Sequence, residues 1–93
     1  MFEISTKLWY GLRAVIEIAK RDHPTSVSEI SKIQGLPVPY LIQILHRLKK
    51  AGILESVRGR DGGYRLKRKP EEITLYEILV PLGGEIAIAP CLN

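Results

Sequence analysis

The chain has 93 residues, of which 45% are hydrophobic and six are aromatic, so it suits one small domain with a mainly aliphatic core. A single Cys excludes an intramolecular disulfide, and no apolar run approaches the roughly 20 residues of a membrane span. Charges at Glu3 and Lys7 interrupt any secretory signal, so we expect a cytoplasmic protein without a membrane partner.

The net charge of +4 is unevenly distributed along the chain. Between Arg47 and Lys69 there are nine Lys and Arg residues and two acids, a net charge of +7, whereas the remainder carries −3. A local positive field of this kind favours polyanions, and duplex DNA is the commonest of these. The competing interpretation of such a cluster is a solvated surface that has no partner.

The first predicted helix spans roughly residues 5–20, because apolar residues recur there at helical spacing. Ser5 or Thr6 is its expected N-cap. The positions expected to form its buried face are Leu8, Leu12, Val15, Ile16 and Ala19.

A capping box starts the second predicted helix, because the Ser26 hydroxyl and the Glu29 carboxylate can satisfy the free N–H groups of a helix start. This helix is short. We expect it to end near Gln34, with Gly35 as a left-handed terminator.

The third predicted helix spans about residues 37–51, and proline is tolerated in its first turn because those N–H groups have no helical partner. Its buried stripe has the spacing i, i+3, i+4 and i+7 and consists of Leu41, Ile44, Leu45 and Leu48. The opposite face is polar and basic, with Gln43, His46, Arg47, Lys49 and Lys50.

Residues 54–57 and 64–67 alternate in a way that suits two short antiparallel strands. A basic, glycine-rich connection joins them, and residues 58–65 form the predicted wing. The connection is longer than a tight hairpin, so we expect it to be mobile without a ligand. Gly59, Gly62 and Gly63 are expected to shape it, the last two by allowing a close turn with positive φ.

A second capping box, Thr74 with Glu77, starts a fourth helix that is expected to reach about Leu82. The apolar segment 85–93 follows, either as a tail that docks on the domain or a partner, or as the start of a longer segment. The predicted fold is therefore mainly α with a small β-wing. It is a winged helix-turn-helix of about four helices plus a two-stranded antiparallel hairpin, over residues 1–84.

A helix that fits a major groove, beside a cationic loop that can reach a minor groove, is a DNA-binding arrangement. We expect helix 37–51 to read the major groove and the wing to enter the minor groove of double-stranded DNA. Candidates for base or groove contacts are Pro39, Tyr40, Gln43, His46, Arg58 and Arg60. Candidates for phosphate contacts are Arg47, Lys50 and Arg65.

Each of these assignments has a structural alternative. A Gln43 amide can make a bidentate pair with adenine, but it can equally be an ordinary solvated residue, as can His46. Tyr40 could bond a phosphate through its hydroxyl or serve only as a packing aromatic. Arg58 suits a narrow minor groove, whose negative potential attracts arginine.

The sequence does not predict an enzyme. The two histidines, at 23 and 46, are expected in a loop and on a polar helix face, without paired carboxylates or metal-ligand spacing. The segment Gly59–Gly63 lies between two predicted strands and precedes no helix, so it is a wing and not a nucleotide-binding loop.

A set of short motifs covers nearly all of residues 1–91. The helical motifs are Ser5-Thr6-Lys7 with Tyr10, Leu12 and Arg13, then Glu29-Ile30, Gln34-Gly35, Tyr40-Leu41, Gln43-Ile44-Leu45, and Leu48 with Lys50-Ala51-Gly52. The most specific ones are Ser56-Val57-Arg58-Gly59, Gly62-Gly63-Tyr64 with Leu66, and Pro70-Glu71-Glu72-Ile73-Thr74. With these motifs the chain resembles the Rrf-two family of bacterial winged-helix regulators, which includes the IscR, NsrR and CymR types.

The resemblance implies a sequence-specific transcription regulator, usually a repressor, that acts as a dimer on partly palindromic operators. It also supports Arg58 as a wing contact and Lys7 as a further phosphate contact. Several members of the family hold an iron–sulfur cluster on three cysteines, and a long helix after them builds the dimer.

The chain departs from this pattern in three places. Cys91 falls where the first cluster cysteine would be, and the other two are absent. The chain stops before a dimerisation helix, so we expect at most a weak homodimer. Ile42 stands at a recognition-helix position that is typically acidic in the iron–sulfur type.

No cofactor is expected in this chain. A cluster would require a longer chain with further cysteines, and Cys91 is otherwise a free thiol. The alternative function is a winged-helix module that binds another protein through the apolar tail 86–92.

Overall fold

The computed structural model describes residues 6–83 of the chain. It contains four α-helices, an antiparallel hairpin and two short 3-10 helices within that range, which confirms the predicted fold class. The elements in chain order are α1 (Thr6–Ala19), α2 (Val27–Gln34), α3 (Val38–Lys50), β1 (Leu54–Val57), β2 (Gly63–Leu66), η1 (Pro70–Glu72), α4 (Leu75–Leu79) and η2 (Val80–Leu82). The predicted tail 85–93, Cys91 and the Ser5 cap lie outside the described residues.

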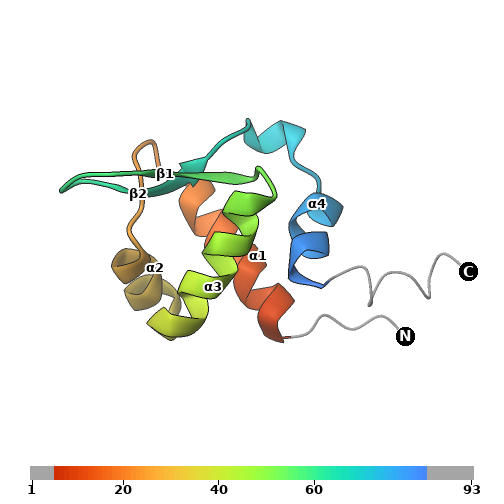
Figure 1. Cartoon of the computed structure of the whole chain (residues 1–93), viewed down its shortest axis with the longest axis horizontal. Helices are drawn as coiled ribbons and strands as arrows, with labels where there is room; N and C mark the ends of the chain where they lie inside the picture. Colours follow the sequence, from red (N-terminus) through yellow and green to blue (C-terminus); the bar gives the residue numbers. More distant parts are fainter. Residues whose placement is uncertain (1–5, 84–93) are drawn as a thin grey trace, which may run out of the picture.

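The helices pack around α1 and α3, with α2 on one side and α4 on the other, and the hairpin extends away from them (Figure 1). The predicted stripe of α3 forms the centre of the core, because Leu41, Ile44, Leu45 and Leu48 are all fully buried. This prediction is confirmed.

The buried face of α1 differs from the predicted one. Ile16 is 50% exposed and Ala19 is exposed, so their assignment to the core was wrong. The helix instead buries a face that includes Gly11 and Ala14. A Cβ built on Gly11 would lie 2.2 Å from Leu82 Cδ1, so the missing side chain allows a close approach between α1 and η2. The contact depends on small residues, which a prediction based on large apolar side chains does not identify.

The start and end of α2 are as predicted. The Ser26 hydroxyl accepts from the Glu29 amide at 3.1 Å, and the Glu29 carboxylate accepts from the Ser26 amide at 3.2 Å. Gly35 ends the helix in the left-handed region at φ 67°. The capping box sets where α2 begins, and the Gly35 cap shapes the turn that leads into α3.

The hairpin pairs Leu54 with Leu66 and Val57 with Gly63, so β2 begins and ends one residue earlier than predicted. It also gains a short third partner that the sequence analysis missed. Thr25, just before α2, exchanges two backbone hydrogen bonds with Tyr64, each 2.8 Å long. The wing is therefore anchored to the segment that leads into the helix-turn-helix.

The fourth helix begins at its predicted capping box, in which Thr74 and Glu77 each bond the other's backbone. It ends at Leu79, however, and continues as the 3-10 helix η2. Pro81 explains the difference, because proline supplies no N–H for an α-helical hydrogen bond.

Candidate nucleic-acid interface

The face of α3 opposite the core presents one line of exposed side chains, most of them polar. Pro39, Gln43, His46 and Lys50 follow one another at spacings of three or four residues, so they share one side of the helix. All four are exposed, as is Arg47 on the flank. The structure therefore brings Pro39, Gln43 and His46 to one side of the helix, but not Tyr40, the fourth groove contact predicted on it.

Tyr40 lies on the flank of α3 and is half-buried. Its ring meets that of Tyr10 on α1 edge to face, with the centroids 5.6 Å apart and the planes at 67°. This packing fixes the start of α3 against α1. Its proposed contact with DNA remains a prediction. Lys7, in the first turn of α1, is also half-buried.

The tip of the wing is formed by glycines in two different ways. Gly59 and Gly63 have φ angles of 114° and 151°, in the region that only glycine adopts easily. Gly62 does not have a positive φ, contrary to the prediction, but a Cβ there would lie 2.1 Å from the Val57 carbonyl oxygen. It is required by close approach of the backbone, and its N–H donates to the Gly59 carbonyl at 3.1 Å.

Gly63 serves a second purpose where β2 begins, beside the segment that leads into α2. A Cβ there would lie 2.4 Å from the backbone of Thr25, at the bridge that anchors the wing. Arg58 and Arg60 extend from the loop that these glycines shape, and both are exposed.

The basic side chains of the described residues differ in whether they have an acidic partner. Lys20, Arg21, Arg65 and Arg68 form ion pairs with acids. Within residues 6–83, the basic residues of α3 and the wing loop form none, namely Arg47, Lys49, Lys50, Arg58 and Arg60. Other lysines of the described residues, such as Lys7 and Lys32, also lack an ion pair, but on α3 and the wing loop every basic residue does.

Arg65 is the exception among the predicted phosphate contacts. Its Nε donates to Glu55 on the neighbouring strand at 2.5 Å. Both side chains are on the outer side of the hairpin and remain partly exposed, so a phosphate would have to compete with Glu55 for the guanidinium.

A buried polar network joins α1 to the end of α2, and the sequence analysis did not predict it. Glu17 is almost fully buried and accepts hydrogen bonds from Arg21 at 2.7 Å and from Gln34 Nε2 at 2.9 Å. Arg13 in turn donates to the side chain and the carbonyl of Gln34, at 2.9 and 2.8 Å. The Arg21 hydrogen bond is the main reason that the pKa of Glu17 is lowered, against the opposing effect of burial. One signal was present in the sequence: an acid on the apolar side of a helix with Arg four residues on.

A second pair fastens the segment after the wing to α4. Arg68 donates to the Glu77 carboxylate at 2.5 Å and to the Glu72 carbonyl at 2.6 Å. Together with the Thr74 backbone, Arg68 lowers the pKa of Glu77 to about 2. Glu77 therefore completes the capping box and anchors the basic run at the same time.

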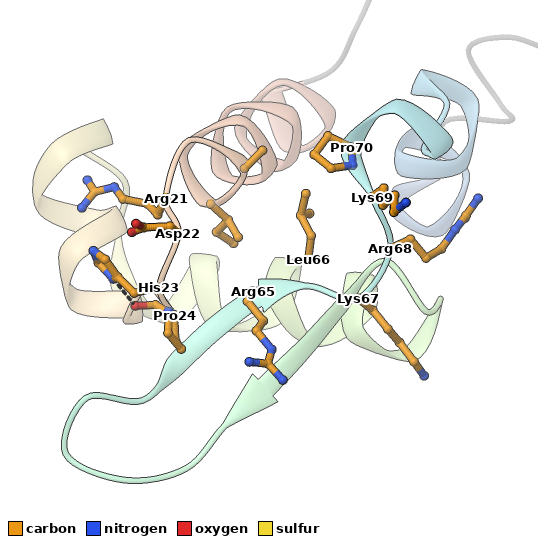
Figure 2. A pocket seen from close by; sticks show the side chains of 12 residues that line it. Arg21, Asp22, His23, Pro24, Arg65, Leu66, Lys67, Arg68, Lys69 and Pro70 are labelled. Atoms are coloured by element: carbon orange, nitrogen blue, oxygen red, sulfur yellow. Dashed lines mark hydrogen bonds between the residues drawn. The ribbon is translucent and has the colours of Figure 1, made fainter.

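A hollow of about 440 Å³ lies between the end of α1 and the segment leaving β2. Figure 2 shows Leu66 pointing into it, whereas Arg65, Lys67 and Arg68 point away. Five Lys and Arg residues and His23 line its edge, but their charged groups do not converge inside the hollow. The hollow also lies apart from the outer face of α3. We therefore place the functional surface on α3 and the wing.

The described residues contain no group of three or more His, Cys, Asp or Glu side chains that could hold a metal ion. No helix within residues 6–83 is both long and apolar enough to cross a lipid bilayer.

Residues 4–93 match the family model described as Rrf2, iron-dependent transcriptional regulator. The chain belongs to the Rrf2 family. This confirms the resemblance to the Rrf-two family. Among its curated relatives, the HTH-type transcriptional regulator CymR of Bacillus subtilis is 41% identical over 87 residues, which are 91% of this chain and 63% of the relative. The HTH-type transcriptional regulator IscR of Aliivibrio salmonicida is 33% identical over 91 residues, 96% of this chain and 54% of the relative.

Solved structures agree with these matches. The global cysteine regulator CymR of B. subtilis superposes with a TM-score of 0.85 at 42% identity, over 90% of this chain and 67% of that chain. IscR of T. potens superposes with a TM-score of 0.82 at 41% identity, over 86% of this chain and 60% of that chain. The chain thus spans 54–63% of the length of these two curated relatives.

The structure gives physical roles to several residues of the Rrf2 motifs. Arg13 and Gln34 hold α1 against α2, and Gly63-Tyr64 fastens the wing to Thr25. These motif residues position α3 and the wing relative to the helical core.

Proposed function

We propose that this chain is a sequence-specific DNA-binding transcriptional regulator of the Rrf2 family that acts as a repressor. In this proposal α3 occupies the major groove and wing residues 58–65 enter the adjacent minor groove. The feature that supports it most directly is the row of unpaired basic side chains on α3 and the wing, beside Gln43 and His46. The family match and the names of the relatives point to the same function.

The groups on α3 are suited to different parts of the groove. The helix start approaches the bases first in helix-turn-helix docking, which places Pro39 and Gln43 nearest to base edges. A Gln amide can bond adenine N6 and N7 together. Arg47 and Lys50 lie nearer the other end of the helix, where phosphates border the groove.

The wing is proposed to read shape more than base identity. Arg58 and Arg60 flank Gly59 at its tip, and a narrow A·T minor groove concentrates negative potential. Wing contacts would therefore favour sequences whose groove is already narrow.

We further propose a homodimer on a two-fold symmetric operator, because one α3 can read only a half-site. No cofactor is needed for these contacts, since every group assigned to DNA is a side chain of α1, α3 or the wing.

The test begins with selection of genomic fragments by the purified protein, which yields the operator. Binding of that operator is then measured by fluorescence anisotropy over a range of salt concentrations. With about six phosphates contacted per protomer, log K should fall with log salt with a slope near −5 for one protomer and near −11 for the dimer on the whole operator. Binding that does not depend on salt would refute the proposal. A reporter gene placed behind the operator should lose expression when the protein is produced, and a gain would refute the repressor assignment.

A further inference from the structure

Two apolar side chains interrupt the polar outer surface of α3. Ile42 is 48% exposed and Val38 is 40% exposed, although four fully buried residues of the same helix already supply its core stripe. Because they are four residues apart, they lie on the same side of the helix, about 40° from each other. They form a small apolar strip along one flank of the DNA-facing surface.

The folded domain gives no reason for Ile at position 42. About half of its surface remains in water, so it realises only part of the free energy that full burial of an Ile side chain would give. A β-branched residue also lowers helix propensity relative to Leu, Lys or Gln, which would fit the same exposed site. Exposure alone does not set Ile42 apart, since Ile16 is exposed to a similar extent, but its place on α3 does.

The place of Ile42 on α3 indicates what would cover it. It lies in the first half of the helix, the part that reaches base edges in helix-turn-helix docking. His46 follows four residues later on the same side, and Gln43 is its immediate neighbour. Ile42 is therefore on the border between the row of polar contacts and the edge of the buried stripe.

We propose that Ile42, with Val38 beside it, recognises the C5-methyl group of thymine in the major groove. This inference rests on the proposed function and adds one specificity-determining residue to it. The major-groove edges of the bases are polar except for that methyl group, and apolar side chains are its ordinary partners. Gln43 and His46 read hydrogen-bonding edges, while Ile42 distinguishes thymine from cytosine by the methyl group.

The test is a methyl scan of the selected operator, in which each thymine in turn is replaced by deoxyuridine. Uracil keeps the pairing and the O4 acceptor of thymine and lacks only the methyl group. Removal of one buried methyl should weaken binding by the wild-type protein about fourfold, at one or two thymines in each half-site. Ile42→Ala should bind the thymine and uracil versions of those sites equally.

Ile16→Ala is the matched control, because Ile16 is 50% exposed but lies on the outer side of α1. It loses the same atoms and should keep the wild-type sensitivity to uracil. Ile42→Val, which loses only one methyl group, should show an intermediate sensitivity. Circular dichroism melting of all three variants establishes that they are folded.

The outcomes are separable. Wild-type binding that is indifferent to uracil at every position overturns the inference and leaves the proposed function standing. Sensitivity that persists in Ile42→Ala at the same thymines assigns the methyl contact to another residue and overturns it too. Absence of duplex binding by the wild-type protein at low salt refutes the proposed function and the inference together.

Discussion

The helical scaffold and the exposed surface formed by α3 and the wing use the same charged residue types in opposite ways. In the scaffold, Glu17 is buried with Arg21 and Gln34, and Glu77 is held by Arg68. On α3 and the wing, five Lys and Arg side chains have no acidic partner within residues 6–83. The difference shows which charges serve folding and which remain available to a partner.

This contrast has an energetic basis. A buried carboxylate is tolerated only when hydrogen-bond donors replace its lost water, so Glu17 needs both of its partners. Exposed like charges on one surface repel one another weakly in water, and their binding to a polyanion is favoured because the counterions condensed on the polyanion are released into solution. Removal of a scaffold charge should therefore affect stability, and removal of a surface charge should affect binding.

The largest effect is expected from Glu17→Ala. It leaves the Arg21 guanidinium and the Gln34 amide without their acceptor at the junction of α1 and α2. The free energy of unfolding should fall by about 3 kcal/mol, as for other pairs that lose one buried partner. Urea denaturation followed by circular dichroism measures it.

Glu29→Ala provides a comparison, because Glu29 is an exposed acid near the same arginine. It should lower stability less than Glu17→Ala. If the two variants unfolded at the same urea concentration as the wild-type protein, the buried network would have no stabilising role and the contrast between the two regions would fail.

Arg58→Ala should have the second largest effect, and on binding instead of stability. We expect a loss of affinity of about tenfold on operators with an A·T-rich minor groove under the wing, and a smaller loss on G·C-rich ones. Inosine–cytosine pairs, which lack the guanine 2-amino group in the minor groove, should behave like A·T pairs. Anisotropy titrations on the three duplexes measure the preference.

Arg60→Ala is the control for loss of one wing charge, since Arg60 lies two residues away in the same loop. It should weaken binding with less dependence on sequence. An equal loss for Arg58→Ala on all three duplexes would show that Arg58 senses only charge.

The elements of this fold were predictable because their signals are local. Two capping boxes, the Gly35 terminator and the α3 stripe each depend on residues a few positions apart, and all four are found in the structure. The exposed line on α3 follows directly from the helix period, so Pro39, Gln43 and His46 share one side of the helix as expected, whereas Tyr40 packs on Tyr10.

The contacts that were not predicted join segments distant in the chain. Arg13 is 21 residues from Gln34, and Thr25 pairs with Tyr64 through backbone atoms that carry no sequence signal. Ile16 was wrongly placed in the core because apolar spacing does not show which of two stripes a helix buries. Gly11 and Leu82 decided that orientation through their close contact.

A smaller, pH-dependent effect is expected from the pair at α4. The fold lowers the pKa of Glu77 from its ordinary 4.5 to about 2, so the carboxylate form stabilises the folded state. That contribution is complete above pH 4.5 and is lost as the pH falls from about 4.5 to 2. The melting temperature of Glu77→Gln should therefore fall less steeply than that of the wild-type protein in this window.

Glu17 and Glu29, whose pKa values are also lowered, are present in the wild-type protein and in Glu77→Gln. They contribute to the fall in melting temperature with pH that the two proteins have in common. If the melting temperatures of the two proteins fell in parallel from pH 6 to 2, the pair between Arg68 and Glu77 would have no stabilising role.

The smallest effect is expected where the two regions meet, at Glu55 and Arg65. Glu55→Ala removes an exposed pair, so the free energy of unfolding should change by less than about 1 kcal/mol. Binding should nevertheless strengthen, because Arg65 becomes free for a phosphate and the wing loses a negative charge. One added phosphate contact makes the slope of log K against log salt steeper by about 0.9.

Asp61→Asn separates the two causes of that gain, because it removes a wing acid that has no ion pair among the described residues. If Arg65 is the released contact, the steeper slope belongs to Glu55→Ala and disappears in the double variant Glu55→Ala/Arg65→Ala. An equal steepening in Asp61→Asn would mean that net charge alone is responsible. Glu55 would then weaken DNA binding only through its negative charge on the wing. Arg65 would belong with the paired charges of the scaffold.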